Sequence, residues 1–113
     1  MSNFEDMPNL NLDGIEEFSS VPQMKVAVTN SGSHWFDKDT MRFFNSKVET
    51  GILNRRFFIT SERETTSEPK KYTIRYFLRE DGEDQLYCYS IGEFQQFESV
   101  ADAKEYLKAY LAQ

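Results

Sequence analysis

Residues 70–80, KKYTIRYFLRE, alternate in the manner of a β-strand. Successive side chains of a strand point to opposite faces of its sheet. The two predicted faces are Tyr72, Ile74, Tyr76 and Leu78, and Thr73, Arg75, Phe77 and Arg79. The pattern therefore predicts a long strand with one apolar face and one basic, aromatic face.

Two further strands are expected on either side of this one. Residues 53–62, LNRRFFITSE, precede a polar run that contains a proline. Residues 85–97, QLYCYSIGEFQQF, follow EDGED at 80–84, where Asp81-Gly82 favours a hairpin turn. Gly92 is expected to mark a bulge or bend. Together the three segments predict an antiparallel meander.

Helices are expected at 99–111 and after residue 37. Ser99 followed by Asp102 resembles a capping box, and the apolar stripe that follows is Val100, Ala103, Leu107 and Tyr110/Leu111. For the earlier helix, Asp37 or Asp39 can cap the free N–H groups. Its apolar stripe would be Met41, Phe44 and Val48, and its end Thr50-Gly51.

Residues 24–30, MKVAVTN, alternate and predict a strand, which NSGS at 30–33 would end. The expected order is then β-α-β-β-β-α. This is an α+β domain with a three- to four-stranded antiparallel sheet and two helices. We expect a single domain over residues 24–113, because 113 residues suit one core.

Residues 1–23 form an acidic N-terminal arm. They carry five acids and no Lys or Arg, a charge of −5 out of the total −6. Leu12, Ile15 and Phe18 could lay a short helix on the domain, or the arm could order only on a partner. Such a segment can shield a basic surface or mimic phosphates, or it can serve solubility and packing.

Composition places the chain among cytoplasmic proteins without a membrane segment. No apolar run approaches the roughly 18 residues of a membrane span, and the N-terminus lacks the basic start and apolar middle of a signal peptide. We expect no enzymatic activity, metal or cofactor, because one His, one Cys and five glycines form no catalytic, metal-binding or phosphate-binding motif.

Two single residues have competing interpretations. His34 is either a helix-entry or surface residue, or a general base. Cys88 is either a small core residue or a reactive thiol, which would need an accessible, electropositive site. The structural interpretation is favoured for both.

Basic residues alternate with aromatics on the expected sheet. A face that shows Arg56, Arg75, Phe77 and Arg79 could stack bases and follow phosphates. The competing interpretation is a solvated outer face with cross-strand ion pairs, or a homodimer interface. The net negative charge argues against nucleic acid.

Three segments carry a resemblance to a known group of proteins. They are FDKDTMRFFNSKV (36–48), RFFITSE followed by KKYTIRYF (56–77), and the terminal pattern F-x-S-x-x-x-A-x-x-Y-L (97–107). The chain resembles small uncharacterised proteins of phages and other bacterial mobile elements, which share an F-x-x-D-T-M-R-F-F-x-S segment. The resemblance covers residues 34–111 and leaves the acidic arm outside. It implies a small accessory protein in a bacterial cytoplasm.

The leading functional hypothesis is a non-enzymatic module that binds a host or phage protein. By analogy with small mobile-element proteins, it could inhibit a host nucleic-acid enzyme or defence system. The alternative is a single-stranded nucleic-acid-binding domain. Aromatics and Arg dominate interface hot spots, so the expected contact residues are Trp35, Arg42, Phe43, Lys47, Arg56, Arg75, Phe77 and Arg79.

Overall fold

The computed structural model describes residues 11–79 and 83–112. The elements begin with the 3-10 helix η2 (Leu12–Gly14) and the helices α1 (Val21–Asn30) and α2 (Lys38–Phe43). The strands are β1 (Lys47–Val48), β2 (Phe58–Glu62), β3 (Lys71–Arg79) and β4 (Leu86–Ile91), and the last element is α3 (Val100–Leu111). The expected turn at Asp81-Gly82 lies outside the described residues.

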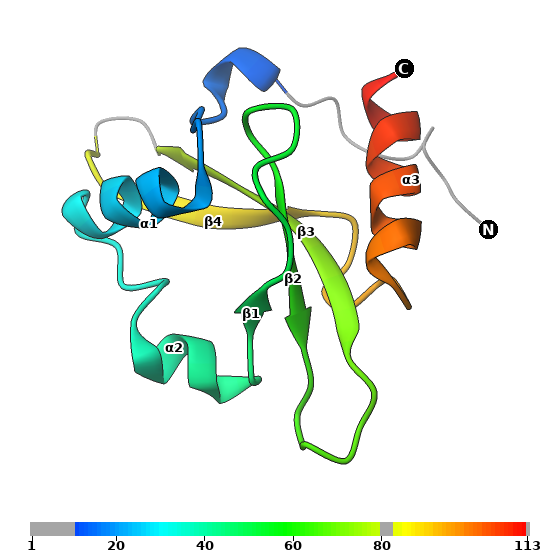
Figure 1. Ribbon diagram of the computed structural model, residues 1–113. Helices are drawn as coiled ribbons and strands as arrows, with labels where there is room; N and C mark the ends of the chain where they lie inside the picture. Colours follow the sequence, from blue (N-terminus) through cyan, green and yellow to red (C-terminus); the bar gives the residue numbers. More distant parts are fainter. Residues whose placement is uncertain (1–10, 80–82, 113) are drawn as a thin grey trace.

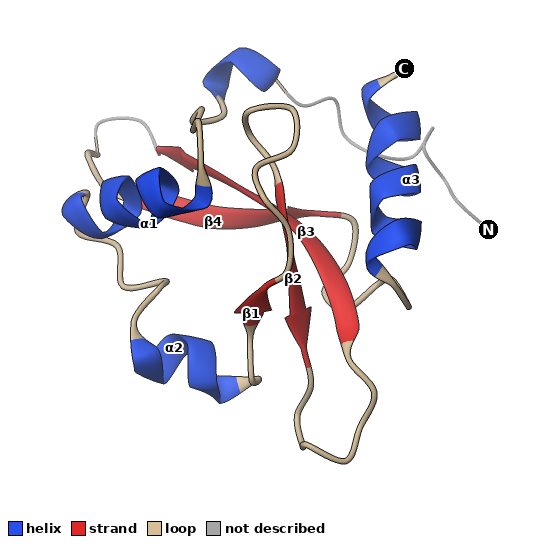
Figure 2. Cartoon of the chain, in the orientation of Figure 1, coloured by secondary structure: helices blue, strands red, loops and turns tan. Residues whose placement is uncertain are grey.

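The four strands form one antiparallel sheet in the order β1-β2-β3-β4. Phe58 faces Arg75 across β2 and β3, and Phe77 faces Cys88 across β3 and β4. Figures 1 and 2 show α3 on one side of the sheet, with α1 and α2 on the other. The prediction of an α+β fold with an antiparallel sheet is confirmed, and the alternation in residues 70–80 places the expected side chains on opposite faces.

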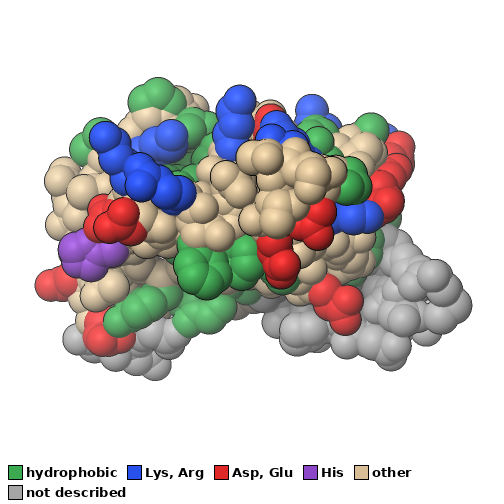
Figure 3. Space-filling model, turned by 90° about the horizontal axis from the view of Figure 1, so that it is seen from below, with side chains coloured by type: hydrophobic (Ala, Val, Ile, Leu, Met, Phe, Trp, Pro, Cys, Tyr) green, Lys and Arg blue, Asp and Glu red, His purple; other side chains and the backbone are tan. Residues whose placement is uncertain are grey.

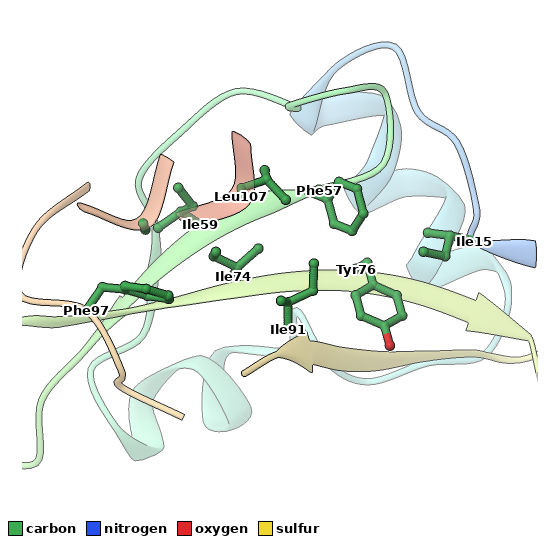
Figure 4. Packing of buried hydrophobic residues seen from close by; sticks show 9 residues of the cluster. Ile15, Phe57, Ile59, Ile74, Tyr76, Ile91, Phe97 and Leu107 are labelled. Atoms are coloured by element: carbon green, nitrogen blue, oxygen red, sulfur yellow. The ribbon is translucent and has the colours of Figure 1, made fainter. Parts of the chain in front are cut away.

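Both faces of the sheet carry a hydrophobic core. The core under α3 contains Ile59, Ile74 and Leu107 (Figure 4). The core under α1 contains Met24, Phe58 and Phe77, each with no exposed surface. The face of β3 that carries Arg75, Phe77 and Arg79 is therefore covered over Phe77, and the expectation of a solvated outer face is wrong there.

The expected strand at 24–30 is the helix α1. Ser20 caps it by accepting a hydrogen bond from Gln23 N–H at 3.2 Å, and the Gln23 side chain accepts from Ser19 N–H at 2.7 Å. The bond to Ser20 satisfies an N–H group that the first turn leaves free, and the bond from Ser19 ties the preceding residue to the helix. Met24 and Val28 are one helical turn apart and buried, so the alternating valines do not form a strand.

The helix expected at residues 37–50 is shorter in the structure than predicted, and it does not include all of its predicted apolar stripe. Asp37 is its N-cap residue, but the Asp37 side chain makes none of the expected capping hydrogen bonds. The helix α2 ends at Phe43 because Asn45 has a left-handed backbone (φ 49°). Ser46 N–H then bonds to Met41 C=O at 2.6 Å and Asn45 N–H to Arg42 C=O at 3.1 Å. This is the Schellman pattern of a helix end. Val48 therefore lies in β1 and not in a third helical turn.

The arm is integrated into the fold from residue 11 onwards. Ile15 bridges to Leu78 of β3, and Glu16 N–H bonds to Phe77 C=O at 2.9 Å. Ile15 and Phe18 are each 3% exposed, and they enter the two cores on opposite faces of the sheet. Within residues 12–18 only Leu12–Gly14 is helical, as the 3-10 helix η2, and Ile15 and Phe18 follow it into the two cores. The arm residues before Asn11, including Phe4 and Met7, lie outside the described residues.

No helix in the described part of the chain is long and apolar enough to cross a membrane.

Candidate functional site: an aromatic groove beside α2

A groove opens between α2, the centre of β3 and the loop after β4. Its volume is about 520 Å³. We define this aromatic groove by six of its lining residues: Trp35, Met41, Phe43, Phe44, Arg75 and Phe94. Figure 3 shows hydrophobic side chains gathered in the middle of this lower face of the molecule, with Lys and Arg side chains above them.

The aromatic rings of the groove form a continuous series. Phe43 packs edge-on against Phe44 with ring centroids 4.5 Å apart, and Phe44 lies 5.2 Å from Phe94. The Arg75 guanidinium follows, 5.8 Å from the Phe94 ring and 5.1 Å from the Trp35 ring. Such cation–π contacts orient the guanidinium and hold the rings around it.

The rings of this series differ in exposure, and the two most exposed are Phe43 and Phe94. Phe43 is 74% exposed and Phe94 43% exposed, whereas Trp35 is half-buried against the fully buried Phe58 and Phe77. Trp35 therefore has a structural role as well as a place in the groove wall. Of these rings, Phe43 is the one whose position is least explained by packing within the chain.

Arg75 is fixed at the base of the groove by a buried polar cluster. Its Nε donates to Thr60 Oγ1 at 2.9 Å, and its Nη2 donates to Glu62 Oε2 at 3.3 Å. The Glu62 side chain has no exposed surface and also accepts from Thr60 Oγ1 and from Thr73 Oγ1, the latter at 2.8 Å. A buried carboxylate needs this set of donors and a countercharge.

The loop that carries Phe94 is shaped by two residues with left-handed backbones. Gly92 has φ 76°, and a Cβ there would clash with the side-chain oxygen of Gln96. Gln95 has φ 59° and ties the loop to the sheet, donating from its N–H to Thr73 Oγ1 at 2.9 Å and from Nε2 to Glu62 C=O at 3.2 Å. The expected bend at Gly92 is thus confirmed, and it turns Phe94 towards the groove.

A second groove of about 420 Å³ adjoins the first and is basic. Lys38, Arg42 and Lys47 line it, and we call these three residues the basic patch. Met41 and Ser46 line both grooves, so the two adjoin at these residues. No carboxylate among residues 11–79 and 83–112 lies within 4.0 Å of a basic-patch nitrogen.

The structure brings together five of the eight residues predicted to contact a partner. Trp35, Phe43 and Arg75 line the aromatic groove, and Arg42 and Lys47 belong to the basic patch.

The other three predicted contact residues lie elsewhere. Phe77 is fully buried, so it offers no surface to a partner. Arg56 donates to Leu12 C=O at 2.8 Å and pairs with Glu17 at 3.4 Å, and Arg79 pairs with Glu16 at 2.7 Å. Arg56, Arg75, Phe77 and Arg79 therefore do not form one exposed face. Acids of the arm form ion pairs with two of them, Arg56 and Arg79.

Three groove residues were not predicted from the sequence: Phe94, Phe44 and Met41. Phe94 was expected inside a strand, although Gly92 two residues earlier marks the bend that frees it. Met41 and Phe44 were assigned to the core, but both are only half-buried and line the groove. Asn45, which can adopt the left-handed conformation at a helix end, is the signal that could have separated Phe44 from Val48.

His34 lies at the surface, and Cys88 lies partly buried in the sheet. The His34 side chain is 82% exposed, and its Nδ1 lies 2.9 Å from Asp37 Oδ2. Cys88 is partly buried beside Arg75, whose Nη1 lies 3.8 Å from its sulfur. Burial raises the pKa of the Cys88 thiol to about 12, although the charge and hydrogen bond of Arg75 act in the opposite direction. A thiol with this pKa is a poor nucleophile at neutral pH.

The fold and the groove together define a small α+β domain with an aromatic groove on one sheet face and a basic patch beside it. Residues 20–108 match a family of unknown function, DUF7447, and the chain belongs to that family. No curated protein and no solved structure matches the chain. The expectation of an uncharacterised family is confirmed.

Proposed function

We propose that this chain is a non-enzymatic protein-binding module whose contact surface is the aromatic groove. The observation that carries the proposal is Phe43, a large apolar ring left 74% exposed on the rim of a groove of about 520 Å³. Exposed apolar surface that surrounds a groove is typical of interaction sites. Phe94, 43% exposed on the facing loop, supplies a second such ring.

The groove has the composition of an interface hot spot. Aromatic residues and Arg are enriched in hot spots, particularly where a partner side chain can enter a desolvated pocket. Arg75 is held by Thr60 and Glu62, so a partner meets a preorganised surface and loses little side-chain entropy on binding.

The proposed setting is a bacterial cytoplasm, with the chain acting as a phage or mobile-element accessory protein. The resemblance of residues 34–111 to mobile-element proteins supports this setting. Within it, we propose a host or phage protein as the partner, and inhibition of a host nucleic-acid enzyme or defence system as the consequence.

Affinity capture with matched variants tests the protein-binding proposal. The full chain would be immobilised and exposed to bacterial lysate, alongside Phe43→Ala, Phe94→Ala and the control Val26→Ala. Val26 is 60% exposed on α1, so its truncation removes exposed apolar atoms, although fewer than a phenyl ring, away from the groove. Circular dichroism and thermal unfolding would establish that each variant is folded.

The expected result is a protein retained by the wild type and by Val26→Ala and lost with both Phe variants. Binding of that protein should also change the emission of Trp35, the one tryptophan in the sequence, because its ring lines the groove. The proposal fails if every retained protein binds the Phe43→Ala and Phe94→Ala variants as well as it binds the wild type.

A further inference from the structure

We propose that the partner contributes an acidic segment with an apolar or aromatic anchor residue. The anchor enters the aromatic groove, and neighbouring carboxylates pair with Lys38, Arg42 and Lys47. This inference rests on the proposed function and adds to it the chemistry of the partner.

The cations of the basic patch form no ion pair within 4.0 Å with a described residue, a property that they share with Lys25, Arg63, Lys104 and Lys108. Six cations have a carboxylate within 4.0 Å: Arg55, Arg56, Lys70, Lys71, Arg75 and Arg79. The three cations of the basic patch, by contrast, have no such contact with any described residue, and all three are exposed. They remain available to charges that a partner brings, in a chain whose net charge is −6.

The aromatic groove itself suits an uncharged anchor. Arg75 is the one cation among its described lining residues, and the charge of Arg75 is balanced by the buried Glu62 at 3.3 Å. The exposed area of the groove lining is largely apolar, and its rim carries Phe43 and Phe94. A neutral apolar side chain can replace water there without leaving a buried charge unpaired.

The adjacency of the two grooves suggests where the partner's charged and apolar groups lie relative to each other. Since Met41 and Ser46 line both, a segment whose anchor occupies the aromatic groove has the basic patch close by. Carboxylates close to the anchor in sequence are therefore the complementary groups. Such contacts at an exposed rim steer association and select the partner, while the anchor supplies most of the affinity.

The observations favour an acidic polypeptide over a single-stranded nucleic acid. Asp39 lines the aromatic groove, and Asp37 immediately precedes α2. A nucleic acid carries one negative charge per nucleotide and would meet these acids and the net negative charge of the chain. A peptide can place two or three carboxylates on the basic patch and a neutral residue beside Asp39.

Selection from a random peptide library tests this inference on the full-length protein. Enriched peptides would be synthesised with a fluorescent label, and their affinities would be measured by polarisation at about 50 and 200 mM salt, a range that separates charge contacts from apolar ones. An unrelated oligothymidine probe would be measured in parallel.

Two double variants give a charge-matched comparison. R42E/K47E reverses two charges of the basic patch. K104E/K108E makes the same change in net charge on α3, which packs on the other face of the sheet, and both lysines are exposed. Phe43→Ala tests the anchor site separately.

The expected peptides combine an aromatic or large aliphatic residue with Asp or Glu nearby. R42E/K47E should weaken them at least about fivefold, because two rim attractions become repulsions, and K104E/K108E should change affinity less than about twofold. Peptides that need Phe43 but are neutral or basic, or are indifferent to R42E/K47E, would overturn the acidic-partner inference and leave the protein-binding proposal standing.

Two other outcomes distinguish failure of this inference from failure of the proposed function. If no peptide is enriched, the inference of a linear acidic segment is overturned, while affinity capture still decides the proposed function. If oligothymidine binds, loses affinity with R42E/K47E and no peptide does so, the surface recognises nucleic acid and both proposals are wrong.

Discussion

Arg75 lies 3.3 Å from Glu62, its ion-pair partner on the neighbouring strand, and the Glu62 side chain has no exposed surface. The two residues are joined through Thr60, whose hydroxyl accepts from Arg75 and donates to Glu62. A buried polar cluster of this kind costs desolvation energy that apolar residues would not. Its effect here is to hold the Arg75 guanidinium between Trp35 and Phe94 in the groove.

Arg75→Leu should lower the free energy of unfolding by about 3–5 kcal/mol, because it leaves the Glu62 carboxylate buried without a countercharge. Arg79→Leu is the matched control. The Arg79 side chain is 44% exposed, so its ion pair with Glu16 should contribute about 0–1 kcal/mol. Urea unfolding measures both. Equal losses of unfolding free energy in the two variants would show that the Arg75–Glu62 pair does not behave as a buried ion pair.

Phe43 and Phe77 should respond in opposite ways to truncation. Phe77→Ala removes a fully buried ring and should cost about 3–5 kcal/mol of stability. Phe43→Ala removes a ring that is 74% exposed and whose ring contact is Phe44, so its cost should stay below about 1 kcal/mol. Urea unfolding of the two variants makes the comparison. A cost near that of Phe77→Ala would mean that Phe43 serves the fold rather than a partner.

The sequence predicts the elements whose periodicity agrees with their caps or turns. The alternation in residues 70–80 and the stripe that follows Ser99 both correspond to observed elements, β3 and α3. Residues 24–30 show the opposite case. Their valines alternate with Lys25 and Ala27 as in a strand, yet Ser20 and Gln23 form a capping pair upstream, and the cap rather than the alternation agrees with α1.

The groove could be predicted only in part. Trp35, Phe43 and Arg75 were expected to contact a partner because of their residue types. Their assembly depends on Phe94, which comes from a loop more than fifteen residues beyond Arg75 in sequence and is positioned by Gly92 and Gln95. The burial of Phe77 was unpredictable for a related reason, since it follows from α1 covering a sheet face that the sequence left open.

Two substitutions test the assignment of residues 21–30 as a helix. Ser20→Ala removes the side chain that accepts from Gln23 N–H and should cost about 1 kcal/mol. Val26→Ala, at an exposed position of α1, should raise stability by a few tenths of a kcal/mol, because Ala is the better helix former. Thermal and urea unfolding give both values. A loss of stability with Val26→Ala would favour an extended conformation, in which Val is preferred.

Glu49 should contribute to stability in a pH-dependent way. Burial raises the pKa of its carboxyl group, but the hydrogen bonds from Ser61 and Lys70 and the charges of Lys70 and Lys47 together hold this pKa below its ordinary value of 4.5. Because the pKa is lowered in the folded state, the contribution is present above about pH 4.5 and is lost as the pH falls through the folded-state pKa.

Glu49→Gln should therefore cost about 1 kcal/mol at pH 7, and its difference from the wild type should shrink as the pH is lowered from 5 to 3. Urea unfolding across this range measures the change. Glu98→Gln serves as the control, because the Glu98 side chain is 71% exposed and its pair with Lys71 should contribute little at any pH. A constant Glu49→Gln difference down to pH 3 would contradict the lowered pKa.

Cys88 should resist thiol reagents as long as the chain is folded. Burial raises its pKa from 9.0 to about 12, so the thiolate fraction at pH 8 is roughly a thousandfold smaller than in an unfolded chain. The reaction with a disulfide reagent should slow by a comparable factor, because the thiolate is the nucleophile. Stopped-flow absorbance with native protein and with protein in concentrated urea measures the two rates. Native reaction within about tenfold of the unfolded rate would show that the sulfur is accessible, and it would reopen the interpretation of Cys88 as a reactive thiol beside Arg75.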